Sequence, residues 1–598
     1  MASKASNLLC LPPEILIRIL SSEVLQDVDV CNASQACESL RQICCCNEIW
    51  KAKFQRRWQS GLSADKASLP PGGWLELFKI RKTIFQQVQK LVKTLAAKNY
   101  HREEVSNESF HDFLQLAELH ERGLAFVLED LHDILECDKY TRLTDKYYSK
   151  KAVYFLNHRW LEEEWTSFLS LPQEQQSMEK GAVMVLDWMR PLKRVSLSDV
   201  SRQLDDIADQ VRAALKLKST DHPACFKDNS HTGFVENLWT VDQCREVLLT
   251  LNSVLFEQLG FKGNAANYYL PDNSFIDEVL EQKKGIPITM SIVYASVARR
   301  LGVILEAVNF PKHFLLRWKE HPMATGVDQY TFVDAFNNGK FHSHKSCRSE
   351  LLDFSDVFDE DIFYPTTLAK LFERSARNLV SIARAFADSD DHIRLLRDGV
   401  ALYLAISPHD RDMKMLQTRI FIHLRINLKD VIEYLQTLPP REGIPSLIHE
   451  CEKQLLMNQT PPEEPTPKHR ADFPMVKFSV GMVMKHKRYD YMCVIYGWDF
   501  ECQASSEWIL QMGVNRLENK HRQPFYNVLV PDGSNRYAAE ENLLYTRDVC
   551  TIGHAEVGKF FEEYTGRHYI PNPYKAKEYP DDTPVTKTLI DNFFASGE

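Results

Sequence analysis

Two side chains in the middle of the chain have the types and spacing that acid–base chemistry needs. His313 lies in the segment VNFPKHFLLRW, and Asp334 lies in the segment YTFVDAF. An imidazole that is oriented by a carboxylate can take a proton from a nucleophile and return it to a leaving group. These two residues are therefore candidates for the base and its orienting partner in a nucleophilic reaction.

The sequence does not supply an obvious nucleophile beside them. No cysteine lies between Cys244 and Cys347, so a local Cys-His-Asp triad cannot be assembled. A nucleophilic cysteine from a distant part of the sequence remains an alternative. The hydroxyls of Thr289 and Ser291 are the nearby alternatives. In two further interpretations, the histidine and the aspartate are purely structural, or they bind a ligand without turning it over.

A buried helix and two strands between Gly285 and Phe336 must position these residues. The two strand segments are aromatic and β-branched and are bounded by turn residues, which predicts His313 on the first strand and Asp334 on the second. The helix begins with Gly-Ile-Pro, and apolar residues follow at helical spacing: Ile288, Ile292, Ala295, Ala298 and Leu301.

The pattern GIP…ARRLGV…HFLLRW…VDAF resembles the transglutaminase-like fold in its SirB-type branch, and the similarity extends over residues 160–370. The resemblance implies a nucleophilic cysteine at the helix N-terminus, where the helix dipole and a nearby imidazolium favour the thiolate. Here that position is Pro287, which suits the first turn of a helix and has no nucleophile. The resemblance thus implies a catalytic fold kept as a scaffold, with Pro287, His313 and Asp334 as relic positions and no catalytic residue.

The composition is that of a globular protein with several domains. A chain of 598 residues with 44% hydrophobic and 26% charged residues suggests about three or four domains. Its net charge of −10 and pI of about 6.1 argue against general polyanion binding. Without a secretory pattern or a membrane-spanning apolar run, we expect a cytoplasmic or nuclear protein that does not contact membranes. The 14 cysteines lack paired spacing, so we expect reduced thiols, no metal site and no cofactor.

Residues 1–60 predict a compact helical unit. Leu-Pro-Pro-Glu starts a helix with proline and an acid in its first turn, and further helices follow. The order of its motif residues resembles an F-box, which implies docking onto the Skp adaptor of cullin-RING ubiquitin ligases. The alternative is an ordinary three-helix subdomain whose apolar stripe packs on its own protein. The predicted adaptor-binding residues are Leu11, Pro12, Ile15, Leu16, Ile19, Leu20 and Trp50.

The segments that connect these motifs are mostly helical. Residues 70–160 have apolar residues every three or four positions and predict a helical spacer before the central domain at 161–370. Residues 371–455 predict helical hairpins of tetratricopeptide type, which the SirB-type resemblance also implies. The Pro- and Glu-rich residues 456–475 predict an extended linker. Residues 576–598 are expected to be a C-terminal tail.

Residues 476–575 alternate β-branched and aromatic residues and have a tight Asp532-Gly533 turn, which predicts strands. They resemble the YccV-like family, named for hemimethylated-DNA binding, which implies a small β-barrel. Residues 476–572 contain 11 Lys and Arg against 12 Asp and Glu, which disfavours duplex binding. A local basic cluster is the best case for DNA, and exposed aromatic residues are the best case for protein binding. The candidate partner-binding residues are Lys485, His486, Lys487, Arg488, Tyr489, Trp498 and Phe525.

Together the resemblances predict an α+β multidomain chain: a helical F-box, a helical spacer, a transglutaminase-like core with helical hairpins, and a small β-barrel. They imply a non-catalytic, substrate-recognition subunit of a Skp–cullin–F-box ubiquitin ligase that marks an unidentified protein for proteasomal degradation. The alternatives are a residual hydrolase or transglutaminase-like enzyme, and a DNA-binding adaptor.

Overall fold

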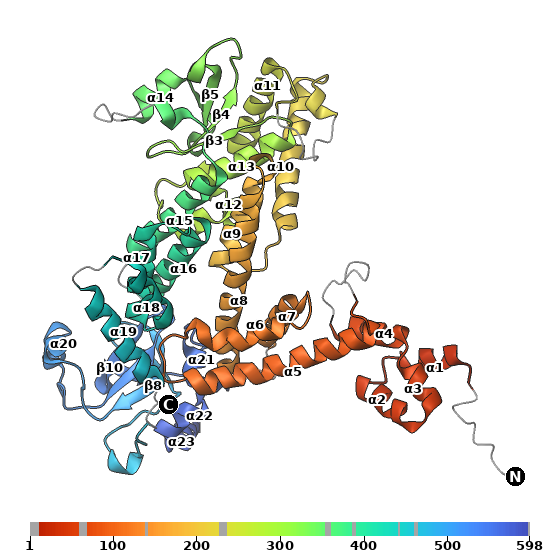
Figure 1. Cartoon of the computed structure of the whole chain (residues 1–598). Coiled ribbons are helices and arrows are strands. Elements are labelled where there is room, and N and C mark those ends of the chain that lie inside the picture. Colours follow the sequence, from red (N-terminus) through yellow and green to blue (C-terminus); the bar gives the residue numbers. More distant parts are fainter. Residues whose placement is uncertain are drawn as a thin grey trace.

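The computed structural model describes residues 11–58, 69–137, 142–226, 236–352, 360–385, 390–439, 443–459 and 465–595. Residues 1–10 of the predicted F-box, 460–464 of the predicted linker and 596–598 of the predicted tail lie outside these ranges. The N-terminal helices lie at the far end of the long helix α5, away from the rest of the molecule (Figure 1). No helix in the described ranges is long and apolar enough to cross a membrane.

The N-terminal unit is helical, as predicted, and its described residues 11–58 form four short helices. Proline at the first position starts the first helix, and Gln26 and Asp29 form a capping box at the start of the second. The helices are α1 (Pro13–Leu20), α2 (Asp27–Ala36), α3 (Glu38–Cys44) and α4 (Asn47–Arg57).

The spacer helices share one hydrophobic core with the N-terminal unit. The rings of Trp50 and Phe78 are 4.9 Å apart, and those of Phe54 and Trp74 are 5.6 Å apart. The N-terminal unit is therefore packed against the spacer. The spacer elements are α5 (Gly73–Asn99), η2 (Asn107–Phe110), α6 (His111–Ala117), α7 (Gly123–Glu136) and α8 (Leu143–Ser170), the last of which continues past the predicted boundary at residue 160.

The central unit surrounds a buried helix, α13 (Pro287–Arg300), which lies where the apolar spacing predicts it. Helices α9, α10, α11 and α12 pack around it, and a four-stranded antiparallel sheet of order β3-β4-β5-β6 covers one side. Leu316 and Val333 pair in register and lie in the same core as α13. The bounds are α9 (Met178–Met189), α10 (Leu197–Lys218), α11 (Val241–Asn252), α12 (Ile276–Gln282), β3 (Glu306–Val308), β4 (Leu315–Lys319), β5 (Tyr330–Asp334), β6 (Lys340–His342) and α14 (His344–Leu351).

Helical hairpins follow the central unit and run back toward the C-terminal unit (Figure 1). Helix α15 is strongly amphipathic and buries Leu371, Phe372, Ala376 and Leu379 in the core of the central unit. The helices are α15 (Leu368–Ala385), α16 (Asp390–Ile406), α17 (Arg411–Leu424), α18 (Leu428–Thr437) and α19 (Ile444–Gln459), so the last helix enters the stretch that was predicted to be an extended linker.

The C-terminal unit contains the predicted strands, which form two small sheets among the described residues. Five of these strands pair antiparallel in the order β10-β9-β8-β7-β11, and β10 and β11 are the two edges, so the strand pairing is that of an open sheet where a closed barrel was predicted. A separate two-stranded sheet pairs β12 with β13. The bounds are β7 (Val483–His486), β8 (Met492–Asp499), α20 (Ser506–Gln511), β9 (Phe525–Leu529), β10 (Asn535–Ala539), β11 (Leu543–Tyr545), α21 (Val557–Phe560), β12 (Phe561–Tyr564), β13 (Tyr569–Pro571), α22 (Pro573–Glu578) and α23 (Asp582–Ala595).

The prediction of a C-terminal tail is wrong. Helix α23 packs against the sheet, and its Ile590 is 1% exposed and belongs to the same hydrophobic core as Trp498. Asp582, at the start of the helix, has no exposed surface. The last helix is therefore an integral part of the C-terminal unit.

Candidate functional site

Helix α1 and the residues before it present an apolar row to solvent. Leu11, Ile15 and Ile19 have exposed fractions of 38%, 43% and 39%, and Pro12 is also exposed. The helical period places Ile15 and Ile19 one turn apart on the same face. We call Leu11, Pro12, Ile15 and Ile19 the exposed stripe.

The other predicted adaptor-binding residues are part of the core. Leu16, Leu20 and Trp50 are buried, and the indole nitrogen of Trp50 donates a hydrogen bond to the carbonyl oxygen of Cys44 at 2.5 Å. The prediction that these three residues face a partner is therefore corrected. They hold α1 and α4 together, because an amphipathic helix must direct one row of its apolar residues into its own unit.

Hydrogen bonds from α4 fix the end of α1 and so the orientation of the exposed stripe. The ammonium of Lys53 donates to the carbonyl oxygens of Ser22 at 2.8 Å and Leu25 at 2.5 Å. The guanidinium of Arg56 donates to the carbonyl oxygen of Ser21 at 2.7 Å. These bonds satisfy carbonyl groups at and after the C-terminus of α1, which otherwise lack helical partners.

At the start of α13, the candidate hydroxyls are not arranged as nucleophiles. Pro287 occupies the first helical position. Thr289 accepts a hydrogen bond from the backbone nitrogen of Ile286 at 3.2 Å and donates to the carbonyl oxygen of Asn273 at 2.7 Å. Ser291 is fully buried, and its hydroxyl has no hydrogen-bond partner in the described part of the chain. Neither hydroxyl is therefore hydrogen-bonded to an imidazole.

His313 does not lie on a strand, which corrects the prediction. The segment VNFPKHFLLRW forms β3 and β4 with a bend between them, and His313 stands in that bend, half-buried. Its backbone nitrogen donates to the carbonyl oxygen of Phe310 at 3.3 Å. The preceding Lys312 has a φ of 59°, a left-handed conformation that reverses the chain. Turn geometry therefore interrupts what reads in sequence as one strand.

Asp334 ends β5 as predicted, and it acts as a cap. Its side chain is buried and accepts hydrogen bonds from the backbone nitrogens of Phe336 at 3.1 Å and Asn337 at 3.2 Å. Burial raises the pKa of Asp334, and the hydrogen bond from Asn337 and the nearby His313 and His342 partly offset that rise. Among the described residues, the carboxylate makes no hydrogen bond to the imidazole of His313.

Two further residues near Asp334 were missed by the sequence analysis as site residues. His342 on β6 is buried, and in the described part of the chain neither of its ring nitrogens has a hydrogen-bond partner. Cys347 on α14 is also buried, and burial together with the charges of Asp334 and Glu350 raises its thiol pKa to about 12. Cys347 is therefore held as an unreactive thiol, although it is the cysteine nearest in sequence to the relic positions. The short KFH segment before a helix capped by Ser343 was the sequence feature that could have placed His342 on a strand.

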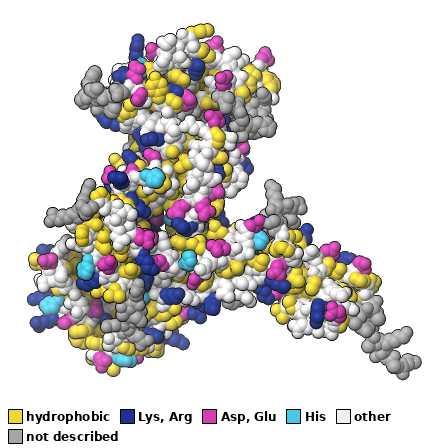
Figure 2. Space-filling model, in the orientation of Figure 1, with side chains coloured by type: hydrophobic (Ala, Val, Ile, Leu, Met, Phe, Trp, Pro, Cys, Tyr) yellow, Lys and Arg dark blue, Asp and Glu magenta, His cyan; other side chains and the backbone are white. Residues whose placement is uncertain are grey.

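In the C-terminal unit, the predicted basic cluster lies on β7 and the turn after it, and its cations have partners. The ammonium of Lys485 is 2.7 Å from the carboxylate of Asp490, and that of Lys487 donates to the carbonyl oxygen of Glu541 at 2.6 Å. The guanidinium of Arg488 lies 5.3 Å from the ring centre of a neighbouring tyrosine. Figure 2 shows basic and acidic side chains interspersed over the visible face of the molecule. The partners of Lys485, Lys487 and Arg488 are therefore those expected for charged residues in a solvent-exposed turn.

His486 and Tyr489 differ in their environment. His486 is 3% exposed, and its Nδ1 accepts hydrogen bonds from the backbone nitrogens of Arg488 and Tyr489, both at 3.2 Å. Burial lowers the pKa of His486, so this residue is not an additional cation, contrary to its place in the predicted cluster. Tyr489 is 63% exposed and is the predicted aromatic residue that remains available to a partner.

Trp498 and Phe525 were predicted to be exposed, and both are buried. The indole nitrogen of Trp498 donates to the carboxylate of Asp582 at 2.9 Å, and the Tyr579 ring packs 5.2 Å away. Phe525 lies in a small core with Val514. The C-terminal segment covers Trp498, a contact that the local sequence around Trp498 does not reveal.

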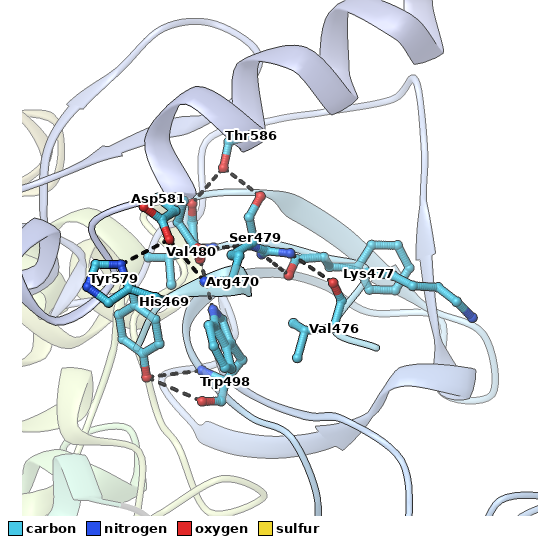
Figure 3. Close-up of polar contacts among 12 residues, drawn as sticks. His469, Arg470, Val476, Lys477, Ser479, Val480, Trp498, Tyr579, Asp581 and Thr586 are labelled. Atoms are coloured by element: carbon cyan, nitrogen blue, oxygen red, sulfur yellow. Dashed lines mark hydrogen bonds and ion pairs between the residues drawn. The ribbon is translucent and has the colours of Figure 1, made fainter. Parts of the chain in front are cut away.

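A polar network joins the end of the predicted linker, the sheet and α23 (Figure 3). Asp582 accepts hydrogen bonds from the guanidinium of Arg470 at 2.8 Å and from the backbone nitrogen of Val480 at 2.7 Å. Ser479 and Thr586 share a hydrogen bond of 2.6 Å. Residues 465–475 are therefore held against the C-terminal unit and are not a free linker.

Three family models match the chain. The F-box-like model covers residues 8–56, the Transglutaminase-like superfamily model covers residues 198–377, and the model described as Hemimethylated DNA-binding protein YccV like covers residues 476–568. These matches confirm that F-box, transglutaminase-like and YccV-like domains are present in an α+β multidomain chain.

Full-length relatives contain the same combination. The chain is 36% identical to F-box only protein 21 of Pongo abelii over 99% of its own length and 94% of the relative's. It is 35% identical to F-box only protein 21 of Mus musculus, over 100% and 96%, and of Homo sapiens, over 99% and 95%. The chain belongs to the F-box only protein 21 family.

About a third of this F-box only protein 21 family member is also similar to bacterial proteins. A UPF0162 protein of Xylella fastidiosa is 30% identical over 33% of this chain and 70% of the bacterial one. No solved structure matches the chain. In this chain the F-box-like and YccV-like matches flank the transglutaminase-like match.

Proposed function

We propose that this F-box protein is a substrate receptor of a Skp–cullin–F-box ubiquitin ligase and that its exposed stripe docks the Skp adaptor. The observation that carries this proposal is the row formed by Leu11, Pro12, Ile15 and Ile19, which is apolar and exposed. Exposed apolar residues that are grouped on one face commonly mark a protein interface. Substrate would be recruited by the other units, in the cytoplasm or the nucleus, for ubiquitination and proteasomal degradation.

The position of the stripe supports this assignment. The F-box lies at the end of α5, away from the central and C-terminal units (Figure 1). The shared core of Trp50, Phe54, Phe78 and Trp74 fixes the F-box on the spacer. A rigid connection lets an adaptor bind at one end while a substrate is held at a defined distance.

The test is co-purification of the adaptor and cullin with the intact chain. We expect a variant with Leu11→Ser, Ile15→Ser and Ile19→Ser to lose both partners, because truncating central apolar anchors commonly costs more than about 1 kcal/mol each. Leu119→Ser is the matched control, because Leu119 is 50% exposed on the spacer. Adaptor recovery by the triple variant equal to that of the control would contradict the proposal.

Deletion of the F-box is the weaker experiment. Residues Trp50, Phe54 and Trp58 fill a core that also contains residues of α5 and α7. Removing residues 1–58 would expose Trp74 and Phe78 and destabilise the spacer. Point substitutions in the exposed stripe avoid this problem.

We also propose that the transglutaminase-like core does not catalyse. This is supported by Pro287 at the position of the nucleophile, by the caps that Thr289 and Asp334 form, and by the raised thiol pKa of Cys347. A core without a nucleophile can still present a surface to a protein substrate.

For the C-terminal unit, we propose protein binding rather than nucleic-acid binding. The paired cations of Lys485 and Lys487, the buried His486 and the exposed Tyr489 support it. Titration of the intact chain with unmodified and hemimethylated duplexes should show no binding near physiological salt. Tight binding that weakens steeply with salt and disappears in a Lys485→Ala, Lys487→Ala, Arg488→Ala variant would contradict the proposal.

A further inference from the structure

A cavity of about 390 Å³ lies where the spacer, the helical hairpins and the C-terminal unit meet. Its walls come from α8, from α16 and α17, and from the loop before η2, and Ala555 of the C-terminal unit also contributes. This volume is within the range of small-molecule binding sites. The cavity is separate from the exposed stripe and from the relic positions of the central unit.

The wall of the cavity has more cations than anions. Its lining includes three carboxylates, those of Glu104, Glu162 and Asp398. Burial of charges in excess of one sign favours a ligand of the opposite sign, because the low local dielectric strengthens each attraction. The lining cations are Lys150, Lys151, Arg159, Arg394 and Arg397.

Some of these lining cations form ion pairs with carboxylates of the protein. Glu104 is 6% exposed; its carboxylate accepts a hydrogen bond from Lys151 at 2.6 Å and another from Arg394 at 2.8 Å. Arg394 also donates to Glu556 at 3.1 Å. These pairs join the spacer, α16 and the C-terminal unit, so Arg394 has a structural role.

The guanidinium of Arg397 makes fewer hydrogen bonds than that of Arg394. Its Nε donates to Asp398 at 2.8 Å, and its Nη1 is 3.7 Å from the carboxylate of Glu104, beyond hydrogen-bonding distance. Across the described ranges, the Nη atoms of Arg397 have no hydrogen-bond acceptor. A guanidinium can bind a carboxylate or a phosphate through two parallel hydrogen bonds from such atoms.

Tyr147 is a second unsatisfied donor in the lining. Its side chain is 7% exposed, and its hydroxyl has no hydrogen-bond partner in the described part of the chain. A buried hydroxyl without a partner costs free energy, and a bound acceptor would remove that cost. Burial raises the pKa of this hydroxyl, the carboxylates of Glu104 and Glu556 act in the same direction, and Arg394 acts against them, so the hydroxyl stays protonated and can donate.

The rest of the lining is apolar and aromatic. Phe110 and Phe155 stack with ring centres 5.0 Å apart, and His158 stacks on Trp188 at 4.4 Å. A second hollow of about 500 Å³ shares Phe155 with the cavity, together with Asn107 and Arg159, so the two spaces adjoin. The cavity thus has cationic residues that could bind an anionic head group and aromatic residues that could contact the apolar body of the same ligand.

We propose that this cavity binds a small organic acid, whose carboxylate or phosphate group lies at Arg397 and Tyr147 and whose apolar body lies against the aromatic wall. Such a ligand would connect the spacer that carries the F-box with the hairpins and the C-terminal unit. Its occupancy would therefore stabilise the relative placement of these three parts.

The test measures thermal unfolding of the intact chain with phenyl phosphate, phenylacetate, inorganic phosphate and benzyl alcohol at matched ionic strength. Phenyl phosphate or phenylacetate should raise the unfolding midpoint more than inorganic phosphate or benzyl alcohol does, and the better of the two acids identifies the head group. Arg397→Gln should abolish this rise, because it removes the guanidinium that the proposal places at the head group; Arg397 also pairs with Asp398 and Glu104, so a second variant separates binding from folding.

Tyr147→Phe provides a second, milder variant. It removes a hydroxyl that bonds nothing in the described part of the chain, so it should fold normally and reduce the ligand-dependent rise. Ser149→Ala is the matched control on α8: the Ser149 hydroxyl is also buried without a partner, but Ser149 does not line the cavity. The proposal is overturned if neither acid exceeds benzyl alcohol, or if Arg397→Gln and Tyr147→Phe both keep the full rise.

Discussion

At the scale of single residues, burial and hydrogen-bond partners distinguish structural residues from catalytic ones. Asp334 has the residue type of an acid–base partner, yet its hydrogen bonds go to the backbone nitrogens of Phe336 and Asn337. Thr289 likewise bonds within the start of its own helix. Their types suit catalysis, and their partners show that they stabilise turns.

The relic positions should therefore affect folding and not turnover. We expect Asp334→Asn and His313→Ala to leave hydrolysis of a glutamine-containing peptide at the level without protein, and Asp334→Asn to destabilise the central unit by about 1 kcal/mol through the weakened cap. Mass spectrometry of the peptide products provides the measurement. Product release by the wild-type chain that disappears in His313→Ala would revive a hydroxyl nucleophile.

A second residue-scale prediction concerns Asp582, which is fully buried and bonds Arg470, Val480 and Trp498. Breaking a buried charge pair commonly costs about 3–5 kcal/mol, so Asp582→Asn should strongly speed hydrogen exchange of the β8 amides in the intact chain. Asp581→Asn is the matched control, since the Asp581 side chain is 41% exposed and solvent screens its charge. Equal exchange rates in the two variants would contradict the role of Asp582.

At the scale of elements, sequence periodicity predicted helices well and strand exposure poorly. Helix α13 could be predicted because proline sets its start and its apolar residues recur at helical spacing. The side chains of Trp498 and Phe525 could not be placed, because the cover over Trp498 comes from a segment about 80 residues later. Leu16 and Ile15 illustrate the same limit on α1: both are apolar, and only packing shows which faces solvent.

The loop before η2 joins elements through Glu104, and its stability should depend on pH. Burial raises the pKa of Glu104, but Lys151, Arg397 and Arg394 together lower it from 4.5 to about 2. Because the folded-state pKa lies below the ordinary value, the stabilisation is complete above pH 4.5 and is lost as pH falls from 4.5 toward about 2. At about 1.4 kcal/mol per pKa unit, it is on the order of 3 kcal/mol.

Urea unfolding of the wild-type chain and of Glu104→Gln checks this prediction. The difference in unfolding free energy should be largest at neutral pH and should shrink as pH falls below 4.5. Glu103→Gln is the control, because Glu103 is the exposed neighbour in the same loop. A difference that stays constant with pH would show that Glu104 acts by packing alone.

At the scale of the whole molecule, the order of domains could be predicted from motifs, and their connections could not. The F-box, the transglutaminase-like core and the YccV-like domain each have local sequence signals, which the family matches confirm. The ion pairs of Arg394 with Glu104 and with Glu556 have no such signal, because they join residues 290 and 162 positions apart in the sequence. The shared core of the F-box and spacer is also visible only in three dimensions.

The most direct test of the receptor assignment is hydrogen exchange of the intact chain with and without purified Skp adaptor. If the exposed stripe is the docking surface, backbone amides of residues 13–25 should exchange more slowly in the complex, and those of the central and C-terminal units should not change. Protection confined to the central or C-terminal unit, or adaptor binding without any protection in α1, would contradict the account.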